Sequence, residues 1–246
     1  KSREDYEILA DMVAEGARTA TGDATTSAEA REYVGDDGLV GFWIVDAVYE
    51  TTNSRDMTDF LFDLMDAPQT VCRAMEAFDE LKKKQIEAFN ESEADVLVYD
   101  VCSASTSLLN PQMVADYVIP RARWVAENVS KDKIWGFFTT GKIRAVLPAL
   151  VDVAPDYIQH FDILGDSDLA EVKREFGSRV AIMGNYSPVV LARGSLADAR
   201  QEAKRCLDAA MAGGGYAITT SDEVPADAKM DNMKAVVEYV NTHGRY

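Results

Sequence analysis

Six short apolar runs, separated by segments with the periodicity of amphipathic helices, constrain the fold of this chain more than any other feature. Most of the runs are nearly continuous in apolar residues, which is typical of parallel strands buried on both faces. The alternation of strand and helix predicts a parallel α/β fold. Strands are expected at 38–47, 95–101, 133–139, 157–161, 179–184 and 215–220.

The helices between these runs are predicted from their ends. Pro68 and Pro111 stand at first-turn positions, where proline loses no hydrogen bond, and Asn110 is a good N-cap. Ser195 and Asp198 have the spacing of a capping box. Helices are therefore expected at 68–88, 110–128, 168–176, 195–213 and 229–241.

Charge limits the partners of the chain. Asp and Glu outnumber Lys and Arg by 42 to 25, for a formal net charge of −17. Such a surface repels phosphate backbones and anionic lipid, so we expect neither nucleic acid nor a membrane as partner. Residues 1–66 carry 16 acidic and 5 basic side chains, and 1–37 is expected to form an acidic helical lead-in. No linker composition interrupts the chain, which predicts one domain over 1–246.

The cysteines and the hydropathy indicate a compartment. Cys72, Cys102 and Cys206 are widely spaced without a CxxC pair, which argues against a disulfide framework or a structural zinc cage. No apolar run approaches the roughly 20 residues that span a bilayer, and no signal-peptide pattern opens the chain. We therefore expect a cytoplasmic protein.

Several motifs in a fixed order carry a family resemblance. The strongest stretch runs from Asp168-Leu-Ala-Glu-Val-Lys173 through Val180-Ala-Ile-Met-Gly-Asn185-Tyr-Ser-Pro188 into the helix at 191–201. Others are Asp66-Ala-Pro68, Tyr99-Asp100, Leu109-Asn-Pro111, Gly214-Gly-Tyr216, Val224-Pro225 and Asp231-Asn-Met233. Through these motifs the chain from Gly41 onward resembles the uroporphyrinogen decarboxylase superfamily, which includes tetrapyrrole decarboxylases and corrinoid-dependent methyltransferases.

This resemblance implies a (β/α)8 TIM barrel, of which the chain supplies about six of the eight strand–helix units. The family's N-terminal third is expected to be absent from this chain. A six-strand arc leaves two strand edges unpaired, which natural proteins normally protect. We therefore expect another copy of the chain, or the acidic N-terminal segment, to cover the gap, and we expect a homo-oligomer.

Reacting groups in such a barrel lie where strands end and loops begin. Reading those positions predicts as catalytic residues Asp100, Asp222 and Asn185. The substrate-binding residues predicted in the same way are Trp43, Asp46, Tyr49, Cys102, Thr139, Thr140, Lys142 and His160. Each of these can instead be a loop-capping or core residue; a hydrogen-bonded structural role for His160 and a buried inert thiol at Cys102 are the plainer readings.

Carboxylates dominate the predicted strand ends. Asp46, Asp100, Asp162 and Asp222 are expected there, with Lys142 as the only cation. Because carboxylates that converge in a partly desolvated pocket repel one another, at least one is predicted to titrate above the ordinary value of about 4.

The metal chemistry of the family does not carry over to these residues. The methyltransferase branch binds zinc through a His-x-Cys-Gly segment and a later Cys, but the matching positions here are Phe138, Thr140 and Asp222. No metal site and no tightly bound cofactor are expected. In the decarboxylase branch the late position is a His, again matched by Asp222, and Tyr49 is the nearest equivalent of its pocket tyrosine.

The favoured function is a methyltransferase-like enzyme that acts on a small molecule, with a corrinoid protein or a small methylated substrate as methyl donor. The corrinoid would be carried by the partner protein. Uroporphyrinogen decarboxylation in tetrapyrrole biosynthesis is the alternative enzyme. A non-catalytic barrel that binds a partner through its acidic face is the alternative outside enzymes.

Overall fold

The computed structural model describes residues 2–20 and 25–245, so residues 1 and 21–24 of the predicted lead-in lie outside the described residues. The described chain divides into two compact units. The first contains Lys1–Ser103 and Met113–Trp135, and the second contains Ala104–Gln112 and Gly136–Tyr246. The prediction of one domain over 1–246 stays a prediction.

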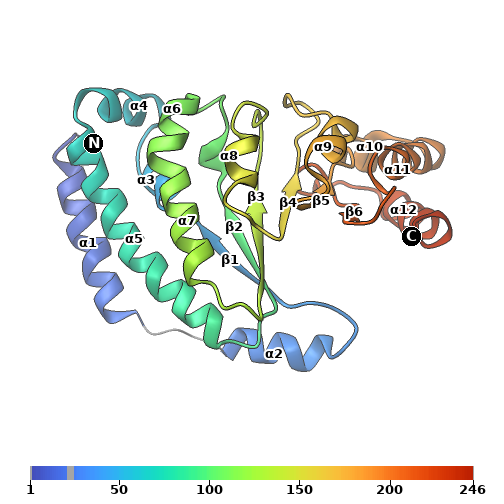
Figure 1. The fold of residues 1–246 in the computed structure, drawn as a ribbon, viewed down its shortest axis with the longest axis horizontal. Helices are drawn as coiled ribbons and strands as arrows, with labels where there is room; N and C mark the ends of the chain where they lie inside the picture. The colour runs from blue at the N-terminus through green and yellow to red at the C-terminus, as the bar shows by residue number, and fades with distance from the viewer. Residues whose placement is uncertain (1, 21–24, 246) are drawn as a thin grey trace. The chain divides into compact units, whose positions relative to one another are not determined.

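The first unit begins with helices and contains the first two strands. Figure 1 shows α1 and α5 side by side, and the buried side chains of α1 are Tyr6, Ala10 and Ala17. Two helices that were not predicted from the sequence, α3 and α4, follow β1. Asp46 and Asp56 are their N-caps. The elements are α1 (Asp5–Thr19), α2 (Thr25–Val34), β1 (Gly41–Val45), α3 (Ala47–Asn53), α4 (Met57–Asp66), α5 (Pro68–Glu91), β2 (Val96–Asp100), η1 (Cys102–Ala104), η2 (Val114–Val118) and α7 (Ile119–Asn128). The short α6 (Pro111–Met113) precedes η2.

The second unit repeats strand and helix more regularly. It contains β3 (Ile134–Phe138) from Gly136 onward, since the first two residues of that strand belong to the first unit. The elements that follow are α8 (Leu147–Val151), β4 (Tyr157–His160), α9 (Leu169–Phe176), β5 (Ala181–Gly184), α10 (Pro188–Arg193), α11 (Leu196–Ala210), β6 (Tyr216–Ala217) and α12 (Met230–His243). The capping box is confirmed: Ser195 and Asp198 bond each other's backbone N–H at the start of α11.

The strands follow chain order. In the first unit β1 pairs with β2 in parallel, and the N–H of Ile134, at the start of β3, donates to the Asp95 carbonyl. In the second unit β3, β4, β5 and β6 pair in parallel. The order β1-β2-β3-β4-β5-β6 with intervening helices confirms a parallel α/β fold of the (β/α)8 type with six strands in the described residues. No helix in those residues has the length and apolarity that would let it cross a membrane.

One face of the second unit's sheet carries its core. Phe137, Ile158 and Ile182 form one cross-strand row and are fully buried. On the opposite face Phe138 pairs in register with Gln159, which is only half-buried. Phe138 and Tyr157 are buried on this face too, so the expectation of strands buried on both faces holds for them, although the face is less completely covered at Gln159. Successive side chains of a strand point to opposite faces of the sheet, so every second residue lies on this face. A continuous apolar run does not reveal that one of the two faces is less covered.

Candidate functional site

The sequence-predicted site residues divide between the two units. The first unit holds Trp43, Asp46, Tyr49, Asp100 and Cys102. The second unit holds Thr139, Thr140, Lys142, His160, Asn185 and Asp222. Each set is described within its own unit.

Asp46 is the N-cap of α3. Its Oδ1 accepts hydrogen bonds from the Val48 and Tyr49 N–H groups at 2.7 and 3.0 Å, and its Oδ2 accepts one from Ser103 Oγ at 2.6 Å. The side chain is fully buried, and burial raises the pKa of Asp46 to about 6, although these hydrogen bonds pull the pKa down. Asp46 therefore caps α3, and its pKa of about 6 lies near physiological pH.

Asp100 ends the neighbouring strand, and its backbone carbonyl accepts the Asp46 N–H at 2.9 Å. Its Oδ1 accepts the Cys102 N–H at 2.9 Å, and the Cys102 side chain also bonds it. Burial raises the pKa of Asp100, with a smaller contribution from the charge of Glu50. The prediction that at least one strand-end carboxyl has a raised pKa is confirmed, but desolvation exceeds the mutual repulsion that the sequence suggested.

The aromatic candidates of this unit are more open. Trp43 is 48% exposed on β1, in register with Val98, so it is a surface rather than a core side chain. Tyr49 is half-buried on α3, two residues into the helix that Asp46 caps. Both could contact a ligand from solvent, whereas Cys102 is buried.

His160 occupies an unusual backbone position at the end of β4. His160 and Phe161 both have left-handed φ angles, of 90° and 48°. Strand alternation would place His160 on the buried face with Ile158; instead its ring lies 4.2 Å from the ring of Phe138, on the opposite face. Gly184 lies in register with His160, and a Cβ there would stand 2.5 Å from the His160 carbonyl oxygen. Strain of this kind in a non-glycine residue clusters at functional sites.

The imidazole of His160 has a buried ring nitrogen whose hydrogen-bonding capacity the described residues leave unsatisfied. Its Nδ1 is buried and has no hydrogen-bond partner among the described residues. Burial lowers the pKa of His160, and the charge of Asp222 opposes that shift. Burial therefore favours the neutral imidazole of His160, and the Asp222 carboxylate lies near it. Because Nδ1 makes no hydrogen bond to the described residues, a hydrogen-bonded structural role through this atom is not observed.

Ser221 and Asp222 follow β6. Ser221 is 1% exposed, and its Oγ has no partner within the described part of the chain. Asp222 is exposed, and its Oδ1 accepts the Glu223 N–H at 2.8 Å. Ser221 stands at a strand end in the sequence but was not predicted as a catalytic or substrate-binding residue, and its burial without a partner is visible only in the structure.

Both polar atoms of the Asn185 side-chain amide make hydrogen bonds. Its Nδ2 donates to the Phe161 carbonyl at 3.1 Å, and its Oδ1 accepts from Arg205 Nη2 at 3.0 Å. Arg205 comes from α11 and also pairs with Glu202. Asn185 therefore ties the loop after β4 to α11 beside a cavity of about 610 Å³ that both residues line.

The remaining candidates are anchored through their backbone or lie in solvent. Thr139 is fully buried and donates its hydroxyl to the Gln159 carbonyl at 2.9 Å. Thr140 is half-buried. The Lys142 side chain is exposed, while its carbonyl accepts the Thr106 N–H at 2.6 Å.

These residues do not fit a zinc ion. Phe138 offers no ligand atom, and its ring packs on His160. The described residues contain no group of three His, Cys, Asp or Glu side chains that could hold a metal. His160 and Asp222 supply two such side chains, one fewer than the three protein ligands of a catalytic zinc site.

Comparison with known proteins agrees with the fold. The family model for uroporphyrinogen decarboxylase (URO-D) matches residues 42–243. A methyltransferase from Methanosarcina mazei has a TM-score of 0.74 at 20% identity; the alignment covers 88% of this chain and 62% of that one. A B12-independent methionine synthase from a Shewanella species, in complex with selenomethionine, has a TM-score of 0.62 at 9% identity, covering 91% and 68%. No curated protein matches the sequence.

Proposed function

The chain belongs to the uroporphyrinogen decarboxylase family, and on that premise we propose that it is a methyltransferase-like enzyme that works without the usual zinc site. The two similar structures are those of a methyltransferase and a methionine synthase, which supports methyl transfer over other chemistry. The chain spans 62% of the length of the Methanosarcina protein. That this shorter chain has methyltransferase activity is therefore itself proposed.

The neutral imidazole of His160 carries this proposal. In the tautomer protonated at Nε2, the unpartnered Nδ1 can accept a proton from a thiol, phenol or amine that lies against Phe138. The heteroatom of this acceptor forms a bond to the methyl carbon, the bond from methyl to its donor breaks with both electrons leaving on the donor, and the proton passes to His160. The nearby Asp222 carboxylate stabilises the imidazolium that results.

The other predicted site residues have supporting roles within this proposal. Within the first unit, Asp100 is a candidate acid–base group, because burial raises its pKa. Asn185 positions the strand-end loop rather than touching substrate, through its bonds to Phe161 and Arg205. Lys142 and Trp43 are open to an incoming ligand.

The methyl donor in this proposal is a methylated corrinoid on a partner protein or a small methylated molecule, and no cofactor is held tightly. A cytoplasmic location belongs to the same proposal and is supported by the three cysteines, which are all free. The acidic surface supports a partner that is neither nucleic acid nor membrane.

Methyl transfer is tested with methylcobalamin as donor and a panel of thiols, phenols and amines as acceptors, with methylated product measured by mass spectrometry. His160→Gln should lower kcat by about 100-fold or more, as expected for loss of a general base. The matched control is His243→Gln, because the other histidine is exposed on α12 and stacks on Tyr239. Absence of transfer to every acceptor class, or an unchanged rate in His160→Gln, would reject the proposal.

Decarboxylation is the second candidate, and Asp100 is the observation that favours it. A carboxyl group whose pKa is raised by burial can protonate the carbon that loses CO₂. Tetrapyrrole binding, discussed below, separates this candidate from methyl transfer.

A further inference from the structure

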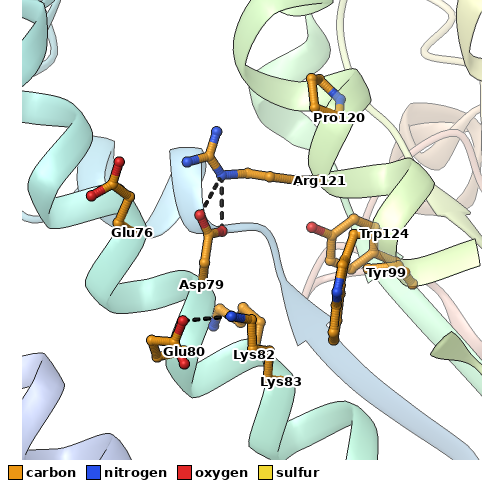
Figure 2. A pocket seen from close by; sticks show the side chains of 10 residues that line it. Glu76, Asp79, Glu80, Lys82, Lys83, Tyr99, Pro120, Arg121 and Trp124 are labelled. Atoms are coloured by element: carbon orange, nitrogen blue, oxygen red, sulfur yellow. Dashed lines mark hydrogen bonds and ion pairs between the residues drawn. The ribbon is translucent and has the colours of Figure 1, made fainter. Parts of the chain in front are cut away.

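A cavity of about 420 Å³ lies in the first unit, against the helix-facing side of β2 (Figure 2). Tyr99 of β2, Asp79 of α5, and Arg121 and Trp124 of α7 line it. Tyr99 and Asp100 are adjacent on β2 and so point to opposite faces of the strand. The cavity is therefore distinct from the strand-end carboxylates, and its volume falls within the range of small-molecule sites.

An irregular helix shapes one wall of the cavity. Residues Val114–Val118 form a π-helical stretch directly before α7, and Pro120 has no N–H to continue the helical ladder. Arg121 uses the local backbone: its Nη1 donates to the Tyr117 carbonyl at 2.7 Å. Stretches of π-helix within helices are frequent at functional sites, and here the irregularity holds Arg121 in place.

The cations around the cavity are already paired. Arg121 Nε donates to both oxygens of Asp79, at 2.8 and 3.1 Å. Lys83 pairs with Glu80. Lys82 is buried, and its Nζ lies 2.8 Å from a Glu50 oxygen. Each of these cations has a carboxylate partner, and Glu76, which has no ion pair among the described residues, is exposed to solvent. An ionic ligand would therefore lose its hydration on entering the cavity and gain little from ion pairing.

The polar atoms of the Asp79–Arg121 pair lie next to an aromatic wall (Figure 2). Figure 2 shows the Tyr99 hydroxyl directed toward the Asp79–Arg121 pair, with the Trp124 ring beside Tyr99. Arg121 Nη2 makes no hydrogen bond to the described residues, so it can donate to a ligand. The Asp79 carboxylate has lone pairs beyond those that Arg121 uses. Burial raises the pKa of Asp79 in spite of Arg121, which indicates a poorly hydrated setting for these atoms.

We infer that this cavity binds a neutral planar heteroaromatic ring of nucleobase type. The ring face lies against Trp124, a ring acceptor takes a hydrogen bond from Arg121 Nη2, and an adjacent ring N–H or amino group donates to Asp79. Stacking on Trp124 supplies the affinity, and the acceptor–donor edge supplies the specificity.

Calorimetric titration of the full chain with adenine tests this inference, with benzoate and benzamidine as planar probes of opposite charge. Adenine should bind saturably, and both charged probes should bind at least about tenfold more weakly. Trp124→Leu and Arg121→Gln should each weaken adenine by about tenfold or more. Glu127→Gln, on the exposed side of the same helix, is the matched control and should leave binding unchanged.

Thermal melts establish that each variant is folded, and Arg121→Lys, which keeps a positive charge beside Asp79 but removes the Nη2 donor, serves if a larger change unfolds the chain. Loss of adenine affinity in Arg121→Lys supports the site. No saturation up to about 5 mM adenine, equal or tighter binding of a charged probe, or full adenine affinity in Trp124→Leu would each overturn the inference.

Discussion

At the scale of single residues, Asp46 combines two demands that conflict. As the N-cap of α3 it accepts two backbone N–H groups, which favours the carboxylate, but complete burial disfavours the charge. The burial effect is the larger one, so the pKa rises from 3.8 to about 6. A carboxyl with a raised folded-state pKa stabilises the fold at low pH and loses that contribution as pH rises through the shifted pKa.

We therefore predict that Asp46→Asn is more stable than the wild type at pH 7. The amide keeps the Oδ1 acceptor and removes the buried charge, for a gain of up to about 3 kcal/mol, given a shift from 3.8 to about 6. The gain should shrink as pH falls from 6 toward 4 in urea unfolding series.

The control for this prediction is Asp56→Asn at the exposed N-cap of α4, where no comparable gain is expected. Equal stability of Asp46→Asn and wild type at pH 7, or a gain that grows toward pH 4, would show that the buried carboxylate carries no such cost.

The residues at the zinc-ligand positions lead to a second prediction at this scale. With Phe138, Thr140 and Asp222 there, purified protein should hold well under one zinc per chain after mild chelation. Elemental analysis by mass spectrometry measures it. One tightly held zinc would mean that other side chains form the site.

At the scale of elements, the capping box of α11 makes a measurable contribution to the free energy of unfolding. Ser195 Oγ accepts the Asp198 N–H, and Asp198 in turn accepts the Ser195 N–H at 2.8 Å. Ser195→Ala should lower the free energy of unfolding by about 1 kcal/mol, measured in urea. Ser178→Ala, at an exposed turn of the same unit, should change it by less than about 0.5 kcal/mol. An effect no larger than that of the control would show that the cap contributes nothing.

At the scale of the whole molecule, the two edge strands matter. Among the described residues β1 pairs only with β2, and β6 only with β5. An unpaired parallel edge invites another chain, and Trp43 on β1 is half-exposed. Light scattering coupled to size exclusion should give a mass above the 27.0 kDa of one chain. Trp43→Glu should lower that mass, and a wild-type monomer at micromolar concentration contradicts the prediction.

Net charge leads to the remaining prediction at this scale. The chain has a formal net charge of −17 and buried carboxyl groups at two of its strand ends. Binding of a polyanionic tetrapyrrole is therefore disfavoured, because each unpaired carboxylate of the ligand adds repulsion. Absorbance titration with uroporphyrin at micromolar concentration should show no binding, and Asp222→Asn should not create it. Saturable binding would favour decarboxylation over methyl transfer.

Local periodicity and end residues predicted the strands, most of the long helices and the parallel α/β class, whereas the barrel type was implied by the family resemblance. All six predicted runs contain the observed strands, and Ser195 and Asp198 begin α11 as expected. The first strand is shorter than its apolar run because Asp46 caps a helix, a local cue that the apolar pattern outweighed.

Only the tertiary structure decided which polar residues can do chemistry. His160 lies against Phe138 because its backbone turns left-handed beside Gly184, and no periodicity predicts that turn. Asn185 is engaged by Arg205, twenty residues away in sequence, and the Tyr99–Asp79–Arg121 cavity joins three separate elements. Burial, hydrogen-bond partners and pKa depend on neighbours that are distant along the chain, so they become defined only when the elements pack.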